Sequence, residues 1–162
     1  MRLWGLALAV LTLVLDQVSK LWALDALQYP PVRIEVLPFW DMVLVWNRGV
    51  SFGLFGDGGL PPLALAAITG AIALGVAVWL ARAASWWTTI AAGLILGGAI
   101  GNIIDRLVYG AVVDFIDWHA YGYHWPVFNI ADAGITLGVG VLIAESLFGG
   151  RKDPKSSGEQ EL

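Results

Sequence analysis

One stretch decides how this chain folds: Phe128-Asn129-Ile130-Ala131-Asp132. Its carboxylate, Asp132, opens an apolar run that continues to residue 144 and is typical of a membrane helix. A carboxylate at that depth costs free energy, so a function or a partner must hold it there. Eighteen residues earlier, Asp114 also stands between apolar neighbours. Because the intervening segment is long enough to fold back, we expect the two acids to meet, and two such acids suggest aspartyl chemistry.

The composition around this stretch is that of an integral membrane protein. The 162 residues are 58% hydrophobic and 14% charged, with a mean hydropathy of +0.73, which is outside the range of soluble domains. The absence of cysteine excludes disulfides, thiol nucleophiles and thiolate metal sites. The nine basic residues are scattered and form no basic face, so we expect no nucleic-acid partner.

Four segments are long and apolar enough to cross a bilayer, which needs about 20 residues each. They are residues 3–24, 60–80, 87–108 and 128–148. We therefore expect an all-α membrane protein with one domain over residues 1–148 and a polar tail over 149–162. The first segment also resembles a secretory signal peptide with Arg2 as its basic start, but Asp16 and Lys20 argue against a cleavage site.

The basic residues predict the orientation of these spans, since they concentrate in cytoplasmic loops. One side of the membrane receives Arg2, Arg82, Arg151, Lys152 and Lys155, whereas the opposite loops hold Arg33 and Arg48. Both termini should therefore be cytoplasmic. Loops 25–59 and 109–127 should be extracytoplasmic, and the β-branched and aromatic residues of 32–37 and 39–46 predict short strands that form a small sheet on the membrane surface.

Polar residues inside the spans lie at one depth. Asp16 comes thirteen residues after Leu3, or about 20 Å along a helix that crosses about 30 Å of hydrocarbon, so it belongs to the outer half. Asp16 and Lys20 are four residues apart and can pair on one helix face. A structural ion pair and a direct catalytic role are both open for them.

The third span carries a stripe of small residues, Gly93, Gly97 and Gly101, which allows another helix to approach closely. Asn102 and Asp105 continue roughly this side of the helix, followed by Arg106. A plain interpretation makes Asp105 and Arg106 an anchor at the helix end.

The last span begins with Asn129 and Asp132, which also permits a plain interpretation. Asn129 would cap the helix, and Asp132 would favour its positive dipole end. That interpretation explains each residue singly but not why polar residues from three helices and a loop all fall in the outer leaflet or just above it. These residues are Asp16, Lys20, Asn102, Asp105, Arg106, Asp114, Asn129 and Asp132. One polar pocket in the outer leaflet explains the set, and its ligand would be a lipid or a lipid-anchored chain.

Five motifs together carry a resemblance. They are Asp16-Gln17 with Lys20, Asn47-Arg48-Gly49-Val50-Ser51-Phe52-Gly53, Gly98-Ala99-Ile100-Gly101-Asn102-Ile103-Ile104-Asp105-Arg106, Val113-Asp114-Phe115, and Phe128-Asn129-Ile130-Ala131-Asp132. In this order and within four spans, they resemble bacterial lipoprotein signal peptidase (signal peptidase II). The pair Val50-Ser51 departs from the two alanines frequent in that family.

The resemblance implies an intramembrane aspartyl endopeptidase of the bacterial cytoplasmic membrane, with its active site near the extracytoplasmic side. It would remove signal peptides from diacylglyceryl-modified prolipoproteins, cutting before the lipidated cysteine. Its fold would be four transmembrane helices with an extracytoplasmic β-cradle in the first outer loop, and its catalytic dyad Asp114 and Asp132. The implied pocket or supporting residues are Asp16, Lys20, Asn47, Gly49, Asn102, Asp105, Arg106 and Asn129. We expect lipid-modified prolipoproteins and membrane lipids as partners, no cofactor or metal, and a monomer.

Other functions have weaker support in the residues. A lipid phosphotransferase would need regularly spaced carboxylates for Mg²⁺, and the chain lacks that spacing. His119 and His124 are better explained by loop packing than by zinc. A serine-lysine peptidase would pair Lys20 with Ser19 or Ser51, but Ser19 points away from Lys20 on a helix. A small transporter is the main alternative outside enzymes, because buried charges also mark ion pathways.

Overall fold

The computed structural model describes residues 1–49 and 60–148. Its four helices are each long and apolar enough to cross a membrane, and they match the four predicted spans to within a few residues. They are α1 (Arg2–Leu27), α2 (Pro62–Ala81), α3 (Trp86–Tyr109) and α4 (Ile130–Phe148). The expectations for Val50, Ser51, Phe52, Gly53 and the tail fall outside the described residues.

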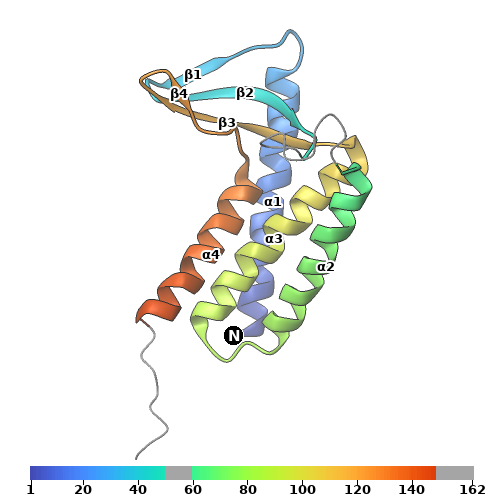
Figure 1. Cartoon of the computed structure of the whole chain (residues 1–162), viewed down its shortest axis with the longest axis vertical. Helices are drawn as coiled ribbons and strands as arrows, with labels where there is room; N and C mark the ends of the chain where they lie inside the picture. The colour runs from blue at the N-terminus through green and yellow to red at the C-terminus, as the bar shows by residue number, and fades with distance from the viewer. Residues whose placement is uncertain (50–59, 149–162) are drawn as a thin grey trace, which may run out of the picture.

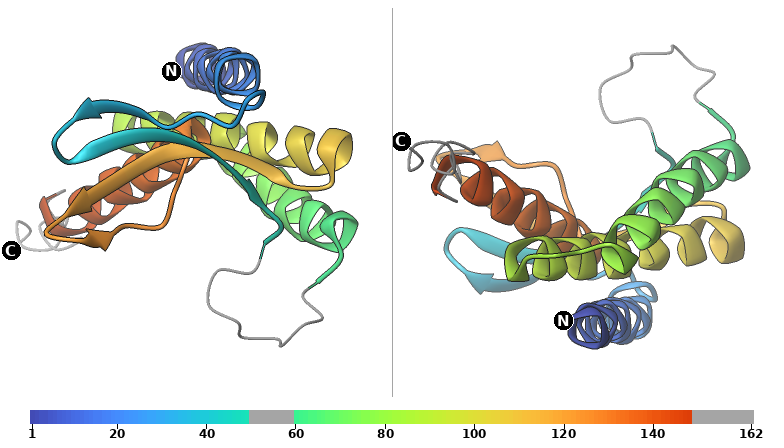
Figure 2. Two further views of the ribbon diagram at one scale, coloured as in Figure 1. Left: turned by 90° about the horizontal axis from the view of Figure 1, so that it is seen from above. Right: turned by 90° about the horizontal axis from the view of Figure 1, so that it is seen from below.

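Helix α3 lies at the centre of the bundle, and α1, α2 and α4 each pack against it (Figures 1 and 2). Its glycine stripe faces α1, as the spacing predicted: a Cβ on Gly93 would lie 2.6 Å from the backbone oxygen of Gly5. A Cβ on Gly97 would collide with the backbone oxygen of Ala9. The two helices therefore touch backbone to backbone, which fixes the height of α1 residues against α3.

Both ends of α3 are defined by local chemistry. Ser85 caps its start by accepting a hydrogen bond from the Thr88 amide at 3.0 Å. Gly110 ends it in the left-handed conformation, with φ of 70°. Strand β3 begins two residues later, so the end of α3 and the start of the sheet are tightly joined.

A four-stranded antiparallel sheet covers one end of the bundle (Figure 1). Its order is β1 (Ile34–Leu37), β2 (Trp40–Asn47), β3 (Val112–Ala120) and β4 (Tyr123–His124). Strands β1 and β2 confirm the predicted strands of the first loop. The expectation of a sheet in that loop alone was incomplete, because β3 and β4 come from the second loop, and an all-α description therefore leaves out half of the site's support.

The segment before α4 is tied to β3. Phe128 forms an isolated antiparallel bridge with Ile116, whose amide donates to the Phe128 oxygen at 2.9 Å. This bridge sets where α4 begins. It brings Asn129 and Asp132 beside Asp114, which lies two residues before Ile116 on the same strand.

Candidate active site

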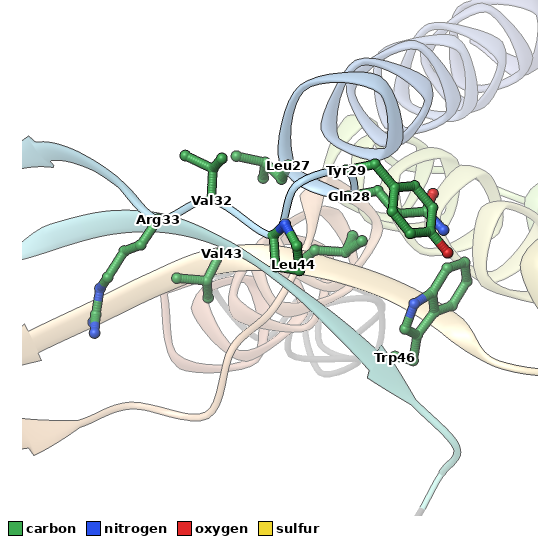
Figure 3. A pocket seen from close by; sticks show the side chains of 9 residues that line it. Leu27, Gln28, Tyr29, Val32, Arg33, Val43, Leu44 and Trp46 are labelled. Atoms are coloured by element: carbon green, nitrogen blue, oxygen red, sulfur yellow. The ribbon is translucent and has the colours of Figure 1, made fainter.

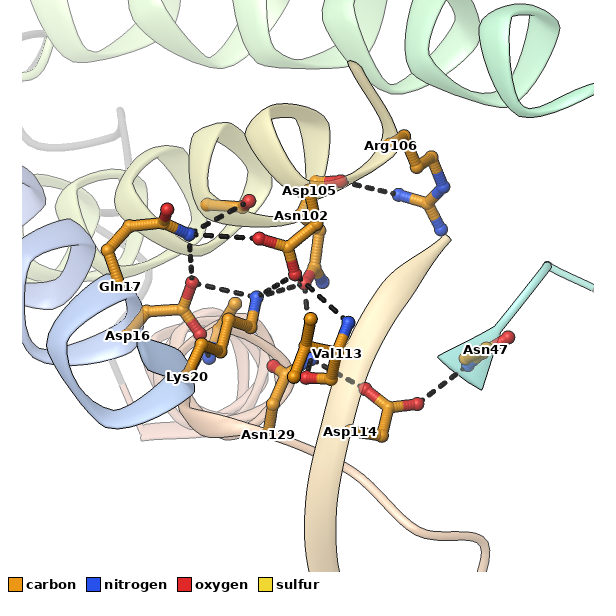
Figure 4. A network of polar contacts seen from close by, with 12 residues as sticks. Asp16, Gln17, Lys20, Asn47, Asn102, Asp105, Arg106, Val113, Asp114 and Asn129 are labelled. Carbon is orange, nitrogen blue, oxygen red and sulfur yellow. Dashed lines mark hydrogen bonds and ion pairs between the residues drawn. The ribbon is translucent and has the colours of Figure 1, made fainter. Parts of the chain in front are cut away.

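The two aspartates predicted to pair both contact one asparagine, Asn129, whose bond to Asp114 is drawn in Figure 4. The side-chain amide of Asn129 donates to Oδ1 of Asp114 at 2.7 Å, and its Oδ1 accepts from the Asp132 amide at 2.9 Å. Oδ2 of Asp132 in turn accepts from the Asn129 amide at 3.4 Å. Asn129 and Asp132 thus form a reciprocal helix cap, as the plain interpretation expected, and the same asparagine also holds Asp114.

Asn102 on α3 connects Asp132 to the buried lysine. Its Nδ2 donates to Oδ1 of Asp132 at 2.8 Å, while its Oδ1 accepts from Lys20 Nζ at 3.0 Å. The ammonium group therefore fixes which way the Asn102 amide faces. Turning that amide over would place an oxygen against the Asp132 carboxylate and a nitrogen against the Lys20 cation.

Lys20 is almost completely buried and has an acceptor for each of its three protons. Besides Asn102, it contacts Oδ2 of Asp16 and Oδ2 of Asp105, both at 2.8 Å. The predicted pair of Asp16 and Lys20 is confirmed. Asp105 is buried and pairs with Lys20 rather than with Arg106, so the anchor interpretation is wrong for Asp105.

Asp16 and Asp105 also hold backbone amides of other segments. Oδ1 of Asp16 accepts from the Ala131 amide of α4 at 2.9 Å, and Oδ2 of Asp105 accepts from the Val113 amide of β3 at 3.1 Å. Lys20 with Asp16, Asn102 and Asp105, here called the Lys20 centre, thereby positions both segments that carry the paired aspartates. A buried charge whose bonds are all made can serve this purpose, whereas one left unpaired is costly.

Gln17 is also part of this centre. Sequence reasoning did not single it out as a site residue, and it appeared only within the Asp16-Gln17 motif. Its Nε2 lies 3.2 Å from Asp16 Oδ2, 3.1 Å from Asp105 Oδ1 and 3.3 Å from the backbone oxygen of Gly101. Two carboxylates of two helices thus share one amide. Gln17 tightens the contact between α1 and α3.

Asn47, at the end of β2, supplies the second contact to Asp114. Its Nδ2 donates to Oδ2 of Asp114 at 2.8 Å, and its Oδ1 accepts from the Gly49 amide at 2.9 Å. Gly49 has a φ of 90°, a conformation that residues other than glycine rarely adopt. A Cβ at this position would also collide with Leu65. The glycine thus holds the turn that orients the Asn47 amide.

Arg106 stands at the edge of this group. Its Nη1 donates to the backbone oxygen of Asn102 at 3.3 Å, and among the described residues it forms no ion pair. Its charge nevertheless lies within electrostatic range of Asp132 and Asp114. All ten site residues expected from the resemblance therefore lie at the sheet end of the bundle and are joined by the contacts above, Arg106 through the backbone of Asn102 alone.

Asp114 is 1% exposed, and its pKa is raised from 3.8 to about 7, chiefly by burial. The neighbouring charge of Asp132 contributes to this rise, whereas the hydrogen bonds from Asn47 and Asn129 oppose it. Asp114 is therefore suited to carry a proton near neutral pH. A protonated carboxyl beside an ionised one can act as acid and base in one reaction.

A cavity of about 690 Å³ opens beside Asp132. Its walls come from three places: Asn47, the segment from Trp125 to Phe128 with Trp118, and one face of α4. The lining is mainly apolar, and it extends along α4 toward Thr136 and Leu137. Asp114 itself is covered by Asn47 and does not line the cavity.

A second hollow lies on the other face of the sheet (Figure 3). It has a volume of about 500 Å³ and lies among the end of α1, Tyr29, Leu44 and Trp46. Neighbouring residues on a strand point to opposite faces, so Trp46 points away from the side where Asn47 meets Asp114. This hollow is therefore separate from the paired aspartates.

Residues of the weaker alternatives have other contacts. The Ser19 hydroxyl donates to the backbone oxygen of Asp16 at 2.8 Å, which occupies its proton within the helix. Ser51 lies outside the described residues. His119 and His124 stack with ring centroids 4.9 Å apart and contact aspartates of the sheet, consistent with loop packing.

Comparison with known proteins agrees with this geometry. The family model described as signal peptidase (SPase) II matches residues 8–148. A lipoprotein signal peptidase of Methylobacterium radiotolerans is 51% identical over 157 residues, covering 94% of this chain and 91% of the relative. One of Methylorubrum extorquens is 50% identical over 147 residues, covering 88% of this chain and 85% of the relative.

Solved structures are similar in fold as well. A bacterial membrane enzyme determined by the in meso method at 1.9 Å resolution has a TM-score of 0.78 and 31% identity, covering 90% of this chain and 94% of its own. A second, at 2.3 Å resolution, has a TM-score of 0.74 and 30% identity, with 98% and 93% covered.

Proposed function

Because this chain belongs to the signal peptidase II family, it is an aspartic endopeptidase that removes signal peptides from prolipoproteins, and we propose that Asp114 and Asp132 are its catalytic pair. The observation that carries the assignment is the junction at Asn129: its side chain donates to the Asp114 carboxylate and accepts from the Asp132 amide, and its own amide donates to the Asp132 carboxylate. The supporting residues hold these two acids. The described helices and sheet act together as one peptidase unit of the bacterial membrane.

We assign the roles within the pair from their surroundings. Asp114, whose pKa is raised to about 7, starts as the acid, and Asp132, which lines the cavity, starts as the base. Asp132 takes a proton from water while the water oxygen attacks the scissile carbonyl carbon. Asp114 gives its proton to the carbonyl oxygen, so that a neutral tetrahedral diol forms.

The second half of the reaction returns both protons. Asp132 protonates the leaving nitrogen as the carbon–nitrogen bond breaks, and one diol hydroxyl gives its proton back to Asp114. The pair then has its starting protonation. Because Asn47 covers Asp114, the substrate carbonyl would replace the Asn47 amide at Asp114 Oδ2.

The apolar cavity accounts for a lipid-modified substrate. Its lining continues from Asp132 along α4, on a face that a membrane helix shows to lipid. We propose that the diacylglyceryl group lies along this face and that cleavage falls just before the lipidated cysteine. The site would then work at the extracytoplasmic side, where the positive-inside rule places the sheet.

The test is cleavage of a diacylglyceryl-modified precursor by purified protein, with sequencing of the new N-terminus. Asp114→Asn and Asp132→Asn should each reduce kcat by at least about 1000-fold, because Asn keeps the shape but cannot pass the proton. The double variant should be no worse than either single one, since the two acids act as a unit. Unchanged cleavage in the presence of chelator would separate this chemistry from a metal-dependent one.

Loss of cleavage can be assigned to the missing carboxylate only if the variant is folded. Thermal unfolding of each variant is therefore measured in the detergent used for the cleavage assay. Asn is as good a helix cap as Asp, and the cap at the start of α4 should survive in Asp132→Asn. Substantial processing by either folded single variant would contradict the pair.

A further inference from the structure

A second group of polar and charged side chains, built around two buried aspartates, lies on the sheet outside the site described above. This Arg33 cluster consists of Arg33, Asp41, Asp117, His119 and His124. Asp41 and Asp117 are each 4% exposed, as deeply buried as the residues of the catalytic network. The proposed reaction uses none of the five.

In this cluster, Arg33 offsets the repulsion between two aspartates on neighbouring strands. Asp41 on β2 and Asp117 on β3 are direct cross-strand partners, and like charges in such positions repel. Arg33 contacts both, with Nε 2.6 Å from Asp41 Oδ2 and Nη2 2.8 Å from Asp117 Oδ2. The guanidinium therefore joins the lead into β1 to β2 and β3.

The histidines extend these contacts to β4. His124 Nδ1 lies 2.9 Å from Asp117 Oδ1, and His119 is the cross-strand partner of His124. His119 Nε2 lies 3.1 Å from Asp41 Oδ2 without hydrogen-bond geometry, so His124 provides the stronger tie. Strand β4 has two residues, and so short a strand has few ladder bonds to hold it.

Two tryptophans that line the cavity beside Asp132 come directly after members of this cluster in the chain. Trp118 follows Asp117, and Trp125 follows His124. The Trp125 amide donates to the Trp118 oxygen at 2.7 Å, and the Trp118 ring meets Phe128 edge-on at 5.0 Å. Because side chains alternate along a strand, Asp117 and Trp118 lie on opposite faces of the sheet. The contacts of the cluster on one face therefore hold in place the aromatic side chains that line the cavity on the other face.

We propose that Arg33, Asp117 and His124 are positioning residues for substrate binding, because they hold Trp118 and Trp125 against the cavity beside Asp132. This inference rests on the proposed use of that cavity for the lipid-modified precursor. Since the cluster touches neither aspartate of the pair, it should govern KM and leave kcat nearly unchanged. A role limited to general stability would lower the amount of active enzyme and leave KM as it is.

Two replacements of His124 test the contact with Asp117 directly. His124→Phe keeps an aromatic ring to stack on His119 but has no donor, whereas His124→Gln keeps a donor for Asp117. We expect His124→Phe to raise KM for the lipidated precursor about five- to tenfold, as loss of a hydrogen bond to a carboxylate would, with kcat within about twofold. His124→Gln should recover most of the affinity, and an equal KM in both variants and the wild type would overturn the proposal.

A reversible cross-link tests the same idea in one folded protein. His119 and His124 are cross-strand partners, whose usual Cα separation suits a disulfide, and the chain has no cysteine of its own. In the variant His119→Cys with His124→Cys, oxidation should restore KM to near the wild-type value and reduction should raise it. Oxidised and reduced forms with one KM, after a free-thiol count confirms the cross-link, would refute positioning.

The failure of this inference is distinguishable from failure of the catalytic assignment. Asp132→Asn should remove kcat whatever the state of the cluster. If Asp132→Asn stayed active, the proposed pair would be wrong. If only the His124 series left KM unchanged, the pair would stand and the cluster would have no part in binding.

Discussion

If the proposed pair is correct, the surroundings of Asp114 set the pH dependence of the reaction. In an ordinary aspartate the proton would be lost well below neutral pH, but burial raises the pKa of this carboxyl to about 7. If Asp114 is the acid, its protonated form is the active one. The rate should then fall as the pH rises through the raised pKa.

We therefore predict that kcat/KM has an alkaline limb near pH 7, and that Asn47→Ala moves this limb to higher pH. The hydrogen bond from Asn47 lowers the pKa of Asp114, so its removal should let the pKa rise. Steady-state rates measured across the pH range check both statements. Thr136→Val is a matched control, because it alters the same cavity without touching Asp114 and should leave the limb in place.

A limb that moved to lower pH in Asn47→Ala would mean that another group controls it. A pH-independent rate across neutrality would assign the acid role elsewhere.

At the scale of helices and strands, much of the arrangement followed from the sequence. Spans appear as long apolar runs, and the depth of Asp16 along the first of them correctly placed the polar group near one end of the bundle. The glycine spacing in α3 correctly predicted a close helix neighbour. These features depend on local periodicity, which one sequence contains in full.

The missing features all depend on contacts between distant segments. Strand β3 carries six buried residues in a row, so it lacks the alternation that marks a half-buried strand, and its pairing with β2 joins two different loops. The partner of Asp105 is decided by how α1 lies on α3. The place of Trp118 and Trp125 on the cavity wall depends on how the short strand β4 pairs with β3.

The meeting of three helices at Gly101 offers a test at this scale. A Cβ there would collide with Oδ2 of Asp16, the carboxylate that pairs with Lys20 and holds the Ala131 amide of α4. We predict that Gly101→Ala destabilises the protein by about 1–3 kcal/mol, as overpacking does, and lowers kcat because α4 loses its anchor. Thermal unfolding and the cleavage assay measure the two effects.

Gly140 on α4 supplies the matched control. A Cβ at this exposed position would meet no atom within 4 Å, so Gly140→Ala should leave both stability and activity at least as high as in the wild type. Equal behaviour of the two variants would show that α1 can yield at Gly101, and that the Lys20 centre does not depend on close packing.

For the whole molecule, the arrangement of helices fixes which parts share a side of the membrane. The start of α1, the connection between α2 and α3, and the end of α4 all lie at the end opposite the sheet (Figure 1). Arg2 and Arg82 lie at this end. From the positive-inside rule we propose that this end is cytoplasmic and that the paired aspartates lie toward the outside.

We predict that Tyr121→Cys reacts with a membrane-impermeant maleimide in intact cells and that Ala84→Cys does not. Tyr121 lies fully exposed in the turn between β3 and β4, and Ala84 is exposed in the connection at the opposite end. Each variant carries a single thiol, because the chain has no cysteine. Both should react once the membrane is permeabilised, which controls for accessibility, and both should process precursor normally. Labelling of Ala84→Cys alone in intact cells would reverse the orientation and place the cavity beside the cytoplasm, where an exported precursor would not present its cleavage site.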